Sequence, residues 1–385
     1  MLRDGSAQDA GFYPDRIEAI KRRAQQWVDE GPAQSLVVLA ARNGVIALHE
    51  AYGVARWDRT EPLQLNAVFP VASMSKPVTA TAIMMLVEDG SLSLNRPLKE
   101  YFPELSGKYS ERILVHQLLT HTSGYADEFR GPPPETDRPL PQGQHPLIHR
   151  QLEALYPKDT YKKPGEQNIY CNTNFMLLGE LVRRVSGQRI DVYAQQHLFA
   201  PLGMDSSAYG ADARTEARFV SRDPAFMPEG MGELGEGLMQ MLDSPNGGGG
   251  LRTCSGDLAI FSELYRNGGE YGGVRLLNEW TVSEMTRNQI PGIGTVNWGQ
   301  VWIKEASWGL GWMIQGDARW RSSHGILQPR GTYYHQGGTG CGFWIDPVHD
   351  VVGIYLSSVP LDFDTGDAHW EFDKFQNMVT AAVAA

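Results

Sequence analysis

One serine in the chain stands three residues before a lysine: Ser73, followed by Lys76. Positions i and i+3 lie on the same face of a helix, so the Ser73 hydroxyl and the Lys76 amine can meet if this segment is helical. Burial disfavours the charged form of a lysine, which can then lose its proton near neutral pH. A serine beside a neutral amine is an activated nucleophile. The spacing therefore predicts covalent chemistry at Ser73.

The residues around this pair indicate that it is buried. The run from Ala67 to Val71 is mostly apolar, and positions 78–87 of the helix that we expect to follow, to about Glu88, are almost wholly apolar. Because a helix that is apolar on all sides is buried, we expect Lys76 in its first turn to be buried as well. The alternative is an exposed helix start, with Ser73 as the N-cap and Lys76 in solvent.

The pattern Tyr-x-Asn occurs at Tyr170 with Asn172 and again at Tyr265 with Asn267. A tyrosine can move a proton, and an asparagine can orient a carbonyl or the lysine amine. The second pattern is followed by two glycines, which is typical of a helix C-terminus. The first pattern opens a predicted helix, and this placement favours it as a site element. The alternative is a tyrosine at a strand end and an asparagine that caps the helix.

A third candidate is His335, which precedes a run containing Gly337, Gly338 and Gly340. Glycines allow backbone N–H groups to approach a ligand closely. One such N–H group, together with that of Ser73 at its helix start, can form an oxyanion hole. A glycine-rich β-hairpin without any role in catalysis is the alternative.

The predicted elements place these motifs on a mixed scaffold. Helices are expected over 14–29, 172–185, 255–266 and 370–383, with short ones within 94–102 and 113–119. Strands are expected over 35–41, 45–51, 308–314, 333–336, 342–345 and 351–357. The turn Asn43-Gly44 between the first two strands is a strong hairpin signal.

Strands near both ends of the chain, with helices between them, predict one sheet closed by both termini and an inserted helical lobe. The fold class is therefore α/β (α+β), an antiparallel sheet flanked by helices. We expect an α/β domain from residues 1–90 and 250–385 and a mainly helical domain over 91–249. Residues 126–165, rich in proline, glycine and charge, are expected to form a long irregular insert beside the active site.

The composition excludes several classes of function. The net charge of -11 over 385 residues argues against a nucleic-acid partner. Cys171, Cys254 and Cys341 lack metal-like spacing, so we expect reduced thiols and no metal or cofactor. No segment resembles a signal peptide or a membrane span, which predicts a cytoplasmic protein. The expected partner is a small ester or amide substrate, and a homo-oligomer is compatible with the sequence.

In this order, the three motifs resemble the serine β-lactamase and penicillin-recognising enzyme superfamily. The resemblance is strongest to its class C-like branch, which includes family VIII carboxylesterases, D-aminopeptidases and transesterases. It spans roughly residues 11–358 and includes further characteristic segments at 118–124, 201–204, 249–253, 308–312 and 344–347. A β-lactamase-like fold and an acyl-enzyme mechanism are what this resemblance implies.

The resemblance also implies roles for individual residues. Ser73 corresponds to the acylated nucleophile and Lys76 to its proton partner. Tyr170 corresponds to a general base, or to a shuttle coupled to Lys76.

Four further residues correspond to substrate-binding positions. Asn172 is expected to orient the substrate or Lys76, and His335 and Gly337 occupy the third motif. The N–H group of Gly338 is expected to complete the oxyanion hole with that of Ser73.

The chain departs from the lactamase pattern at His335, where a lysine usually holds the substrate carboxylate. A neutral imidazole cannot replace a fixed ammonium as a carboxylate anchor. We therefore predict a carboxylesterase for short to medium acyl esters, with at most weak β-lactamase activity. A D-amino-acid peptidase or amidase and a β-lactamase are alternatives, and a non-catalytic β-lactam sensor or scaffold is an alternative from another class. The absence of a Gly-x-Ser-x-Gly elbow argues against an α/β-hydrolase.

Overall fold

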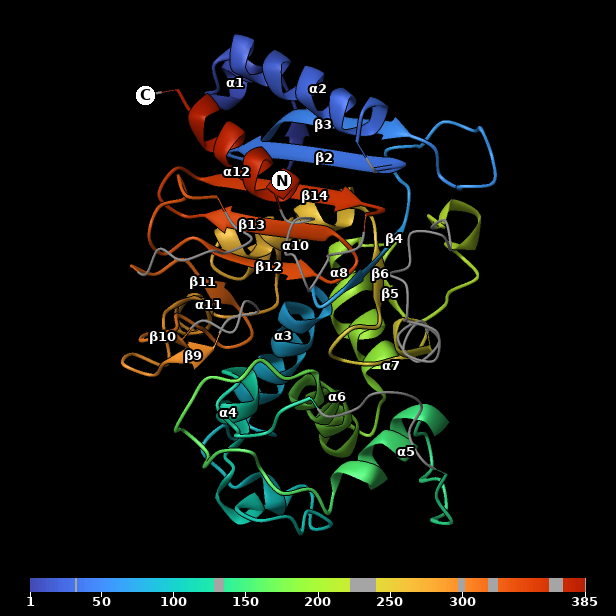
Figure 1. Cartoon of the computed structure of the whole chain (residues 1–385), viewed down its shortest axis with the longest axis vertical. Coiled ribbons are helices and arrows are strands. Elements are labelled where there is room, and N and C mark those ends of the chain that lie inside the picture. The colour runs from blue at the N-terminus through green and yellow to red at the C-terminus, as the bar shows by residue number, and fades with distance from the viewer. Residues whose placement is uncertain are drawn as a thin grey trace.

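A computed structural model describes the chain except residues 32, 128–134, 222–239, 297–301, 318–324, 360–369 and 385. Its main feature is a seven-stranded sheet with the strand order β1-β3-β2-β14-β13-β12-β11 (Figure 1). All neighbouring strands are antiparallel except β1 and β3. The strands are β1 (Arg3–Asp4), β2 (Ser35–Arg42), β3 (Val45–Gly53), β11 (Met313–Ile314), β12 (Tyr333–Gly337), β13 (Cys341–Asp346) and β14 (Val351–Ser357).

The sheet joins the two ends of the chain, because β14 pairs along its whole length with residues 36–42 of β2. This confirms the prediction of a mainly antiparallel sheet built from both termini. The β2–β3 turn is also the predicted hairpin: Asn43 and Gly44 have φ of 54° and 75°, as a type I′ turn requires. The division of the chain into domains at residues 91 and 249 stays a prediction.

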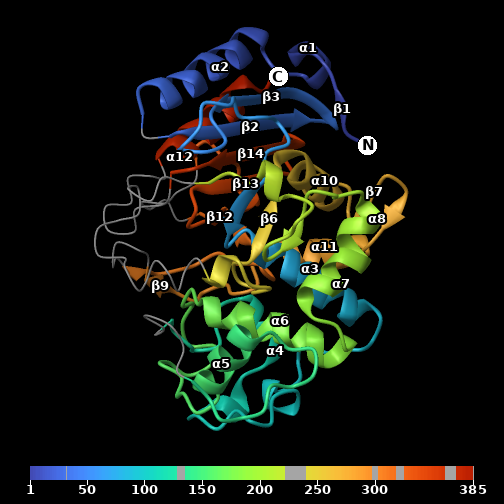
Figure 2. The ribbon, with the colours of Figure 1, turned by 90° about the vertical axis from the view of Figure 1, so that its right-hand side faces the viewer.

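Along each strand the side chains alternate between the two faces of the sheet, and both faces are buried in a hydrophobic core. Leu36 and Val38 of β2 join a core with helices α2 (Pro14–Asp29) and α12 (Trp370–Ala382). Val37 and Leu39 point the other way, into a larger core that also contains residues of α10 (Ser255–Arg266). Figures 1 and 2 show α2 and α12 over one face of the sheet and α10 on the opposite side. The period of two along the strand therefore fixes which helices cover which face.

Helix α3 (Ser75–Glu88) occupies the centre of the molecule. It is buried on nearly all sides, as its apolar sequence predicts. It lies between the sheet and a group of helices that includes α4 (Val115–Leu119), α5 (Pro146–Leu155) and α6 (Asn172–Ser186), as both views show (Figures 1 and 2). The start of α3 therefore lies where the two parts of the molecule meet.

A sharp turn leads from β4 (Phe69–Ala72) into α3. Ala72 has a φ of 45°, in the left-handed region that favours glycine. The Ser75 hydroxyl holds this turn, because it donates to Ala72 O (2.5 Å) and accepts from Leu251 N–H (2.9 Å). The turn is thereby tied to β6 (Leu251–Thr253), the strand that pairs with β4.

The remaining elements are short or peripheral. The helices are α1 (Ala7–Ala10), α7 (Ile190–Ala194), α8 (Ala200–Leu202) and α11 (Glu279–Thr286), with a π-helical turn at Gln195–Phe199 and 3-10 turns at Leu98–Glu100, Ser110–Arg112 and Glu216–Arg218. The strands are β5 (Ala208–Tyr209), β7 (Glu270–Tyr271), β8 (Val274–Arg275), β9 (Thr295–Val296) and β10 (Trp302–Ile303). Within the described ranges no helix is both long and apolar enough to span a bilayer.

Three expected elements differ from the structure. The insert at 126–165 contains helix α5, which begins at Pro146 and buries Leu147, Leu152 and Leu155; proline at the first helical position favours such a start. The strand expected over 308–314 is reduced to Met313–Ile314, because Gly309 N–H bonds to Trp312 O and closes a turn. The helix expected within 94–102 is only the 3-10 turn that follows Pro97.

Leu86→Ala should lower the free energy of unfolding by about 2–5 kcal/mol, because Leu86 is 3% exposed within the central core. Leu140→Ala is the matched control, since Leu140 is 48% exposed, and it should change stability by no more than about 0.5 kcal/mol. Urea denaturation of both variants measures this difference. Equal losses would contradict the central position of α3.

Candidate active site

The candidate nucleophile and its lysine meet at the start of α3. Lys76 Nζ lies 2.9 Å from Ser73 Oγ, as the i, i+3 spacing predicts. Lys76 is fully buried, whereas Ser73 is partly exposed. The nucleophile can therefore be reached while the amine beside it is removed from water.

Two further acceptors surround the lysine amine. Lys76 Nζ donates to Asn172 Oδ1 at 2.8 Å and to Gly248 O at 2.8 Å. A neutral amine has two N–H groups and one lone pair. When its two N–H groups donate to Asn172 and Gly248, the lone pair faces the Ser73 hydroxyl. This arrangement orients the amine to accept the serine proton.

Burial lowers the pKa of Lys76 from 10.5 to about 7. The negative charge of Asp127 acts in the opposite direction and raises this pKa. Burial is the largest cause, because removal of an ammonium from water disfavours its charged form. The amine is therefore poised to exchange a proton near neutral pH.

Close backbone packing brings the Gly248 carbonyl to the lysine. A Cβ atom added at Gly247 would lie 2.6 Å from Phe175 O in α6, so only glycine fits there. The Thr79 hydroxyl donates to Gly247 O (2.8 Å) and fixes the loop against α3. The sequence shows the glycine run but gives no indication that one of its carbonyls contacts Lys76.

Tyr170 lies against both members of the pair. Its ring centroid is 4.8 Å from Lys76 Nζ, and its hydroxyl shares a hydrogen bond with Ser73. Burial raises the pKa of Tyr170 well above its usual range, so its hydroxyl is protonated at neutral pH. Of these two groups, Lys76 is the one that changes its protonation state near pH 7.

His335 lies on β12, beside the same group of side chains. Its Nδ1 is 2.8 Å from Gln336 O, which identifies Nδ1 as the protonated nitrogen. Its Nε2 is buried and has no hydrogen-bond partner among the residues that the structure describes. Burial and the Lys76 charge lower the pKa of His335 to about 3, so the ring is neutral.

The glycines after His335 allow β12 to approach the nucleophile turn. A Cβ atom at Gly337 would lie 2.1 Å from Val71 O, so the strand must have glycine there. Gly338 follows in the turn that leads to β13. The third motif and the Ser73 segment are therefore held side by side, although the oxyanion role of Gly338 stays a prediction.

The sequence matches the family model described as Beta-lactamase over residues 20–376, which is most of the chain. The chain belongs to the beta-lactamase family. It is thus a member of a superfamily of serine hydrolases, and its mainly antiparallel sheet with flanking helices is the fold that the resemblance implies.

Individual relatives are distant but cover nearly the whole chain. A protein of Escherichia coli (strain K12) named "Putative D-alanyl-D-alanine carboxypeptidase" is 27% identical, over 94% of this chain and 86% of that protein. Among solved structures, EstCE1, a hydrolase with promiscuous acyltransferase activity, has a TM-score of 0.72 at 21% identity and covers 96% of this chain and 98% of its own. A penicillin-binding protein homologue from Caulobacter crescentus has a TM-score of 0.73 at 20% identity, with coverage of 97% and 99%.

In this beta-lactamase-family chain, the two Tyr-x-Asn patterns lie in different places. The Tyr265 hydroxyl pairs with Thr81 Oγ1 (2.7 Å), and its ring packs on Trp312 in the core. Asn267 caps the C-terminus of α10. Only the pattern that includes Tyr170 reaches the candidate site, as its placement at a helix start predicts.

Sequence reasoning assigned no role to His121, Trp308 or Asp127. His121 is fully buried, stacks on Tyr170 at 4.6 Å and meets the edge of Trp308 at 4.8 Å. Its Nδ1 accepts a hydrogen bond from Cys171 N–H (3.0 Å). Burial lowers the pKa of His121 well below its usual range, so the ring is a neutral support for Tyr170. His121 belongs to the segment 118–124, and the resemblance of this segment to the family is the signal in the sequence that points to it.

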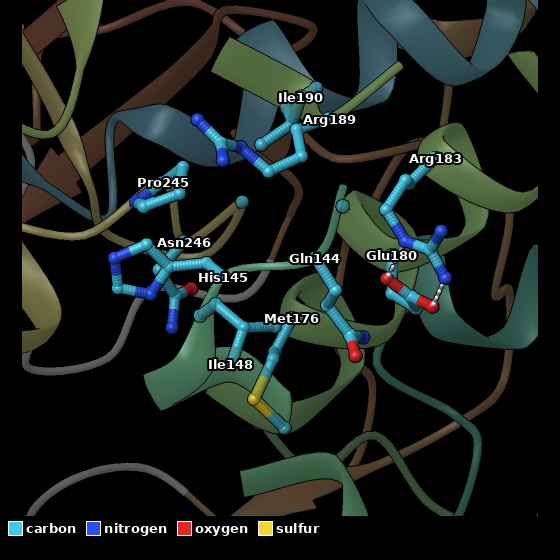
Figure 3. A pocket seen from close by; sticks show the side chains of 12 residues that line it. Gln144, His145, Ile148, Met176, Glu180, Arg183, Arg189, Ile190, Pro245 and Asn246 are labelled. Carbon is cyan, nitrogen blue, oxygen red and sulfur yellow. Dashed lines mark hydrogen bonds and ion pairs between the residues drawn. The ribbon is translucent and has the colours of Figure 1, made fainter. Parts of the chain in front are cut away.

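A separate pocket lies between α5, α6 and α7, next to the glycine loop whose Gly248 carbonyl contacts Lys76 (Figure 3). Asn246 and Gly247 line it, together with Gln144 and His145. None of the predicted site residues contributes to its lining. In the part of the chain that the structure describes, no cluster of three or more potential metal ligands is found.

Lys76→Met should stabilise the folded protein at about pH 6, and the gain should shrink as the pH rises toward about 10. The folded-state pKa of Lys76 is about 7 and its ordinary value is 10.5. Below pH 7 the penalty for the buried ammonium is complete. Between these two values folding requires release of the lysine proton, and the penalty fades because this release costs less as the pH approaches the ordinary pKa. Urea denaturation at several pH values measures the difference. Lys99→Met, at an exposed lysine, is the control, and a gain for Lys76→Met that is independent of pH would contradict the lowered pKa.

Proposed function

We propose that the chain is a carboxylesterase that works through an acyl-enzyme on Ser73. The observation that carries this proposal is the buried Lys76 amine, which lies 2.9 Å from Ser73 Oγ and donates to Asn172 and Gly248. Once the amine is neutral and both of its N–H groups are used in this way, its lone pair is left for the Ser73 hydroxyl. Membership of the beta-lactamase family supports the same nucleophile.

In the first half-reaction, Ser73 Oγ attacks the ester carbonyl and its proton passes to Lys76. The N–H groups of Ser73 and Gly338 would receive the negative charge that develops on the carbonyl oxygen. Lys76 returns the proton through the Tyr170 hydroxyl to the leaving alkoxide, the bond between the acyl carbon and that oxygen breaks, and the alcohol departs. The Tyr170 hydroxyl fits a relay because it is protonated and bonded to Ser73.

In the second half-reaction, water attacks the acyl carbon of the ester on Ser73. Lys76 and Tyr170 take the water proton and return it to Ser73 Oγ as the bond to the acyl carbon breaks. The carboxylic acid is released and the resting hydroxyl is restored. The same two groups therefore act as base and then as acid in each half-reaction.

The neutral state of His335 favours ester substrates without a carboxylate. Its Nδ1–H donates to Gln336 O, and its Nε2, which has no partner among the described residues, is a hydrogen-bond acceptor. An acceptor cannot bind a carboxylate oxygen, which is also an acceptor. The site would therefore lack the fixed cation that holds the carboxylate of a β-lactam or of a peptide C-terminus.

A D-amino-acid carboxypeptidase is the second candidate, and the 27% identical E. coli relative favours it by its name. The two candidates share the nucleophile and differ in the leaving group and in the need for a carboxylate anchor. A cytoplasmic location and a homo-oligomeric state stay predictions for this chain.

Ser73→Ala should reduce turnover of p-nitrophenyl butyrate by about 10⁴–10⁶-fold, because removal of such a nucleophile has effects of this size. Ser91→Ala, at an exposed serine beyond the other end of α3, should retain wild-type activity. Steady-state kinetics together with labelling by a fluorophosphonate probe measure both effects. A Ser73→Ala variant that keeps most of its activity would show that another residue is the nucleophile.

The wild-type protein should have a higher kcat/KM for p-nitrophenyl butyrate than for nitrocefin or for a peptide ending in D-Ala-D-Ala. His335→Lys should shift the ratio toward nitrocefin by at least about tenfold, the size of one charge-assisted hydrogen bond. His335→Gln, which adds no charge, should leave the ratio near that of the wild type. If the wild-type protein prefers nitrocefin or the peptide, the esterase proposal is wrong.

A further inference from the structure

Asp127 gathers five hydrogen bonds at the start of α6. Its Oδ2 accepts from Asn172 N–H (2.8 Å) and Asn172 Nδ2 (2.8 Å). Its Oδ1 accepts from Thr173 N–H (3.1 Å), Thr173 Oγ1 (3.2 Å) and Cys171 Sγ (3.1 Å). The residue at the N-cap of α6, Cys171, makes no side-chain cap of its own. A carboxylate from 45 residues earlier in the chain therefore caps this helix.

These bonds fix which way the Asn172 amide points. Because Asn172 Nδ2 donates to Asp127, its Oδ1 is directed to Lys76 Nζ at 2.8 Å. A flipped amide would place its NH₂ group against the lysine amine and its oxygen against the carboxylate, and both contacts would be unfavourable. The carboxylate therefore determines that Lys76 meets an acceptor here.

Asp127 also differs in charge from the other groups near the lysine. Among the described residues, the titratable groups that face Lys76 are Asp127, Tyr170, Cys171, His121 and His335. Burial raises the pKa of Tyr170 and of Cys171 and lowers the pKa of His121 and of His335. These four groups are consequently neutral near pH 7, and Asp127 is the member of the set whose charge acts on the Lys76 amine.

We propose that Asp127 is a positioning residue of this site, which directs the oxygen of Asn172 to Lys76 and stabilises the ammonium that forms when Lys76 takes the serine proton. The inference rests on the proposed function, in which Lys76 is the proton acceptor. A negative charge that acts on the ammonium lowers the energy of the state after proton transfer more than that of the neutral state before it. Asp127 itself contacts neither the nucleophile nor the leaving group.

Asp127→Asn and Asp127→Ser test the proposal, because asparagine and serine can both still cap a helix but carry no charge. Asp159→Asn is the matched control: Asp159 is also exposed and also accepts a backbone hydrogen bond, from Lys108 N–H (2.7 Å). The measurement is the rate of fluorophosphonate labelling of the full chain between about pH 5 and 9, together with kcat/KM for p-nitrophenyl butyrate over the same range.

For the Asp127 variants we expect the acidic midpoint of the labelling profile to move down by about half a pH unit, the size expected for one partly screened charge. The direction follows because the Asp127 charge raises the pKa of Lys76. The plateau rate should fall about tenfold or more, since a small displacement of a catalytic group can cost up to about 10² in rate. Asp159→Asn should change neither quantity.

Several outcomes would overturn the proposal. An unchanged midpoint and plateau would do so, even if the melting temperature falls, because Asp127 would then serve only as a helix cap. Failure of both variants to fold would also count against it, since the carboxylate would be purely structural. If wild-type protein is labelled at Ser73 but hydrolyses no ester, the proposed function fails, while the labelling profiles still decide the role of Asp127.

Discussion

The site depends on the removal of one lysine amine from water. An ammonium in the centre of a protein is costly, and Lys76 is tolerated there because Ser73, Asn172 and Gly248 all lie within hydrogen-bond distance of its Nζ. The same burial lowers the pKa of the amine to about 7. The burial that costs stability would therefore also supply the base that we propose for Ser73. Active sites often combine a loss of stability with a gain in function in this way.

The fold provides this environment through segments that are far apart in the sequence. The turn from β4 into α3 positions Ser73 and Lys76, the start of α6 provides Asn172, and a glycine loop provides the Gly248 carbonyl. Each segment is held by its own contacts: Ser75 bonds the turn, Asp127 caps α6, and Thr79 holds the loop. The three segments come from different parts of the chain, and together they enclose the Lys76 amine from several directions.

Family membership constrains the nucleophile more than the substrate. Proteins similar to this chain include one named as a carboxypeptidase and one described as a hydrolase with acyltransferase activity. A shared fold does not define a shared substrate, because specificity lies in the groups around the acyl carbon. In this chain we propose the neutral His335 as such a group, and it is the basis for the expected preference for esters.

The sequence alone determined the features that depend on near neighbours. The i, i+3 spacing of Ser73 and Lys76, the Asn43-Gly44 hairpin and the apolar character of α3 each follow from local periodicity or from the demands of a turn. Only the tertiary structure decided that the Gly248 carbonyl and the Asp127 carboxylate complete the site. A backbone carbonyl is the same in every residue, and a cap supplied from 45 positions away leaves no pattern beside the helix that it caps. Such contacts are fixed by the path of the chain in space, which no local pattern contains.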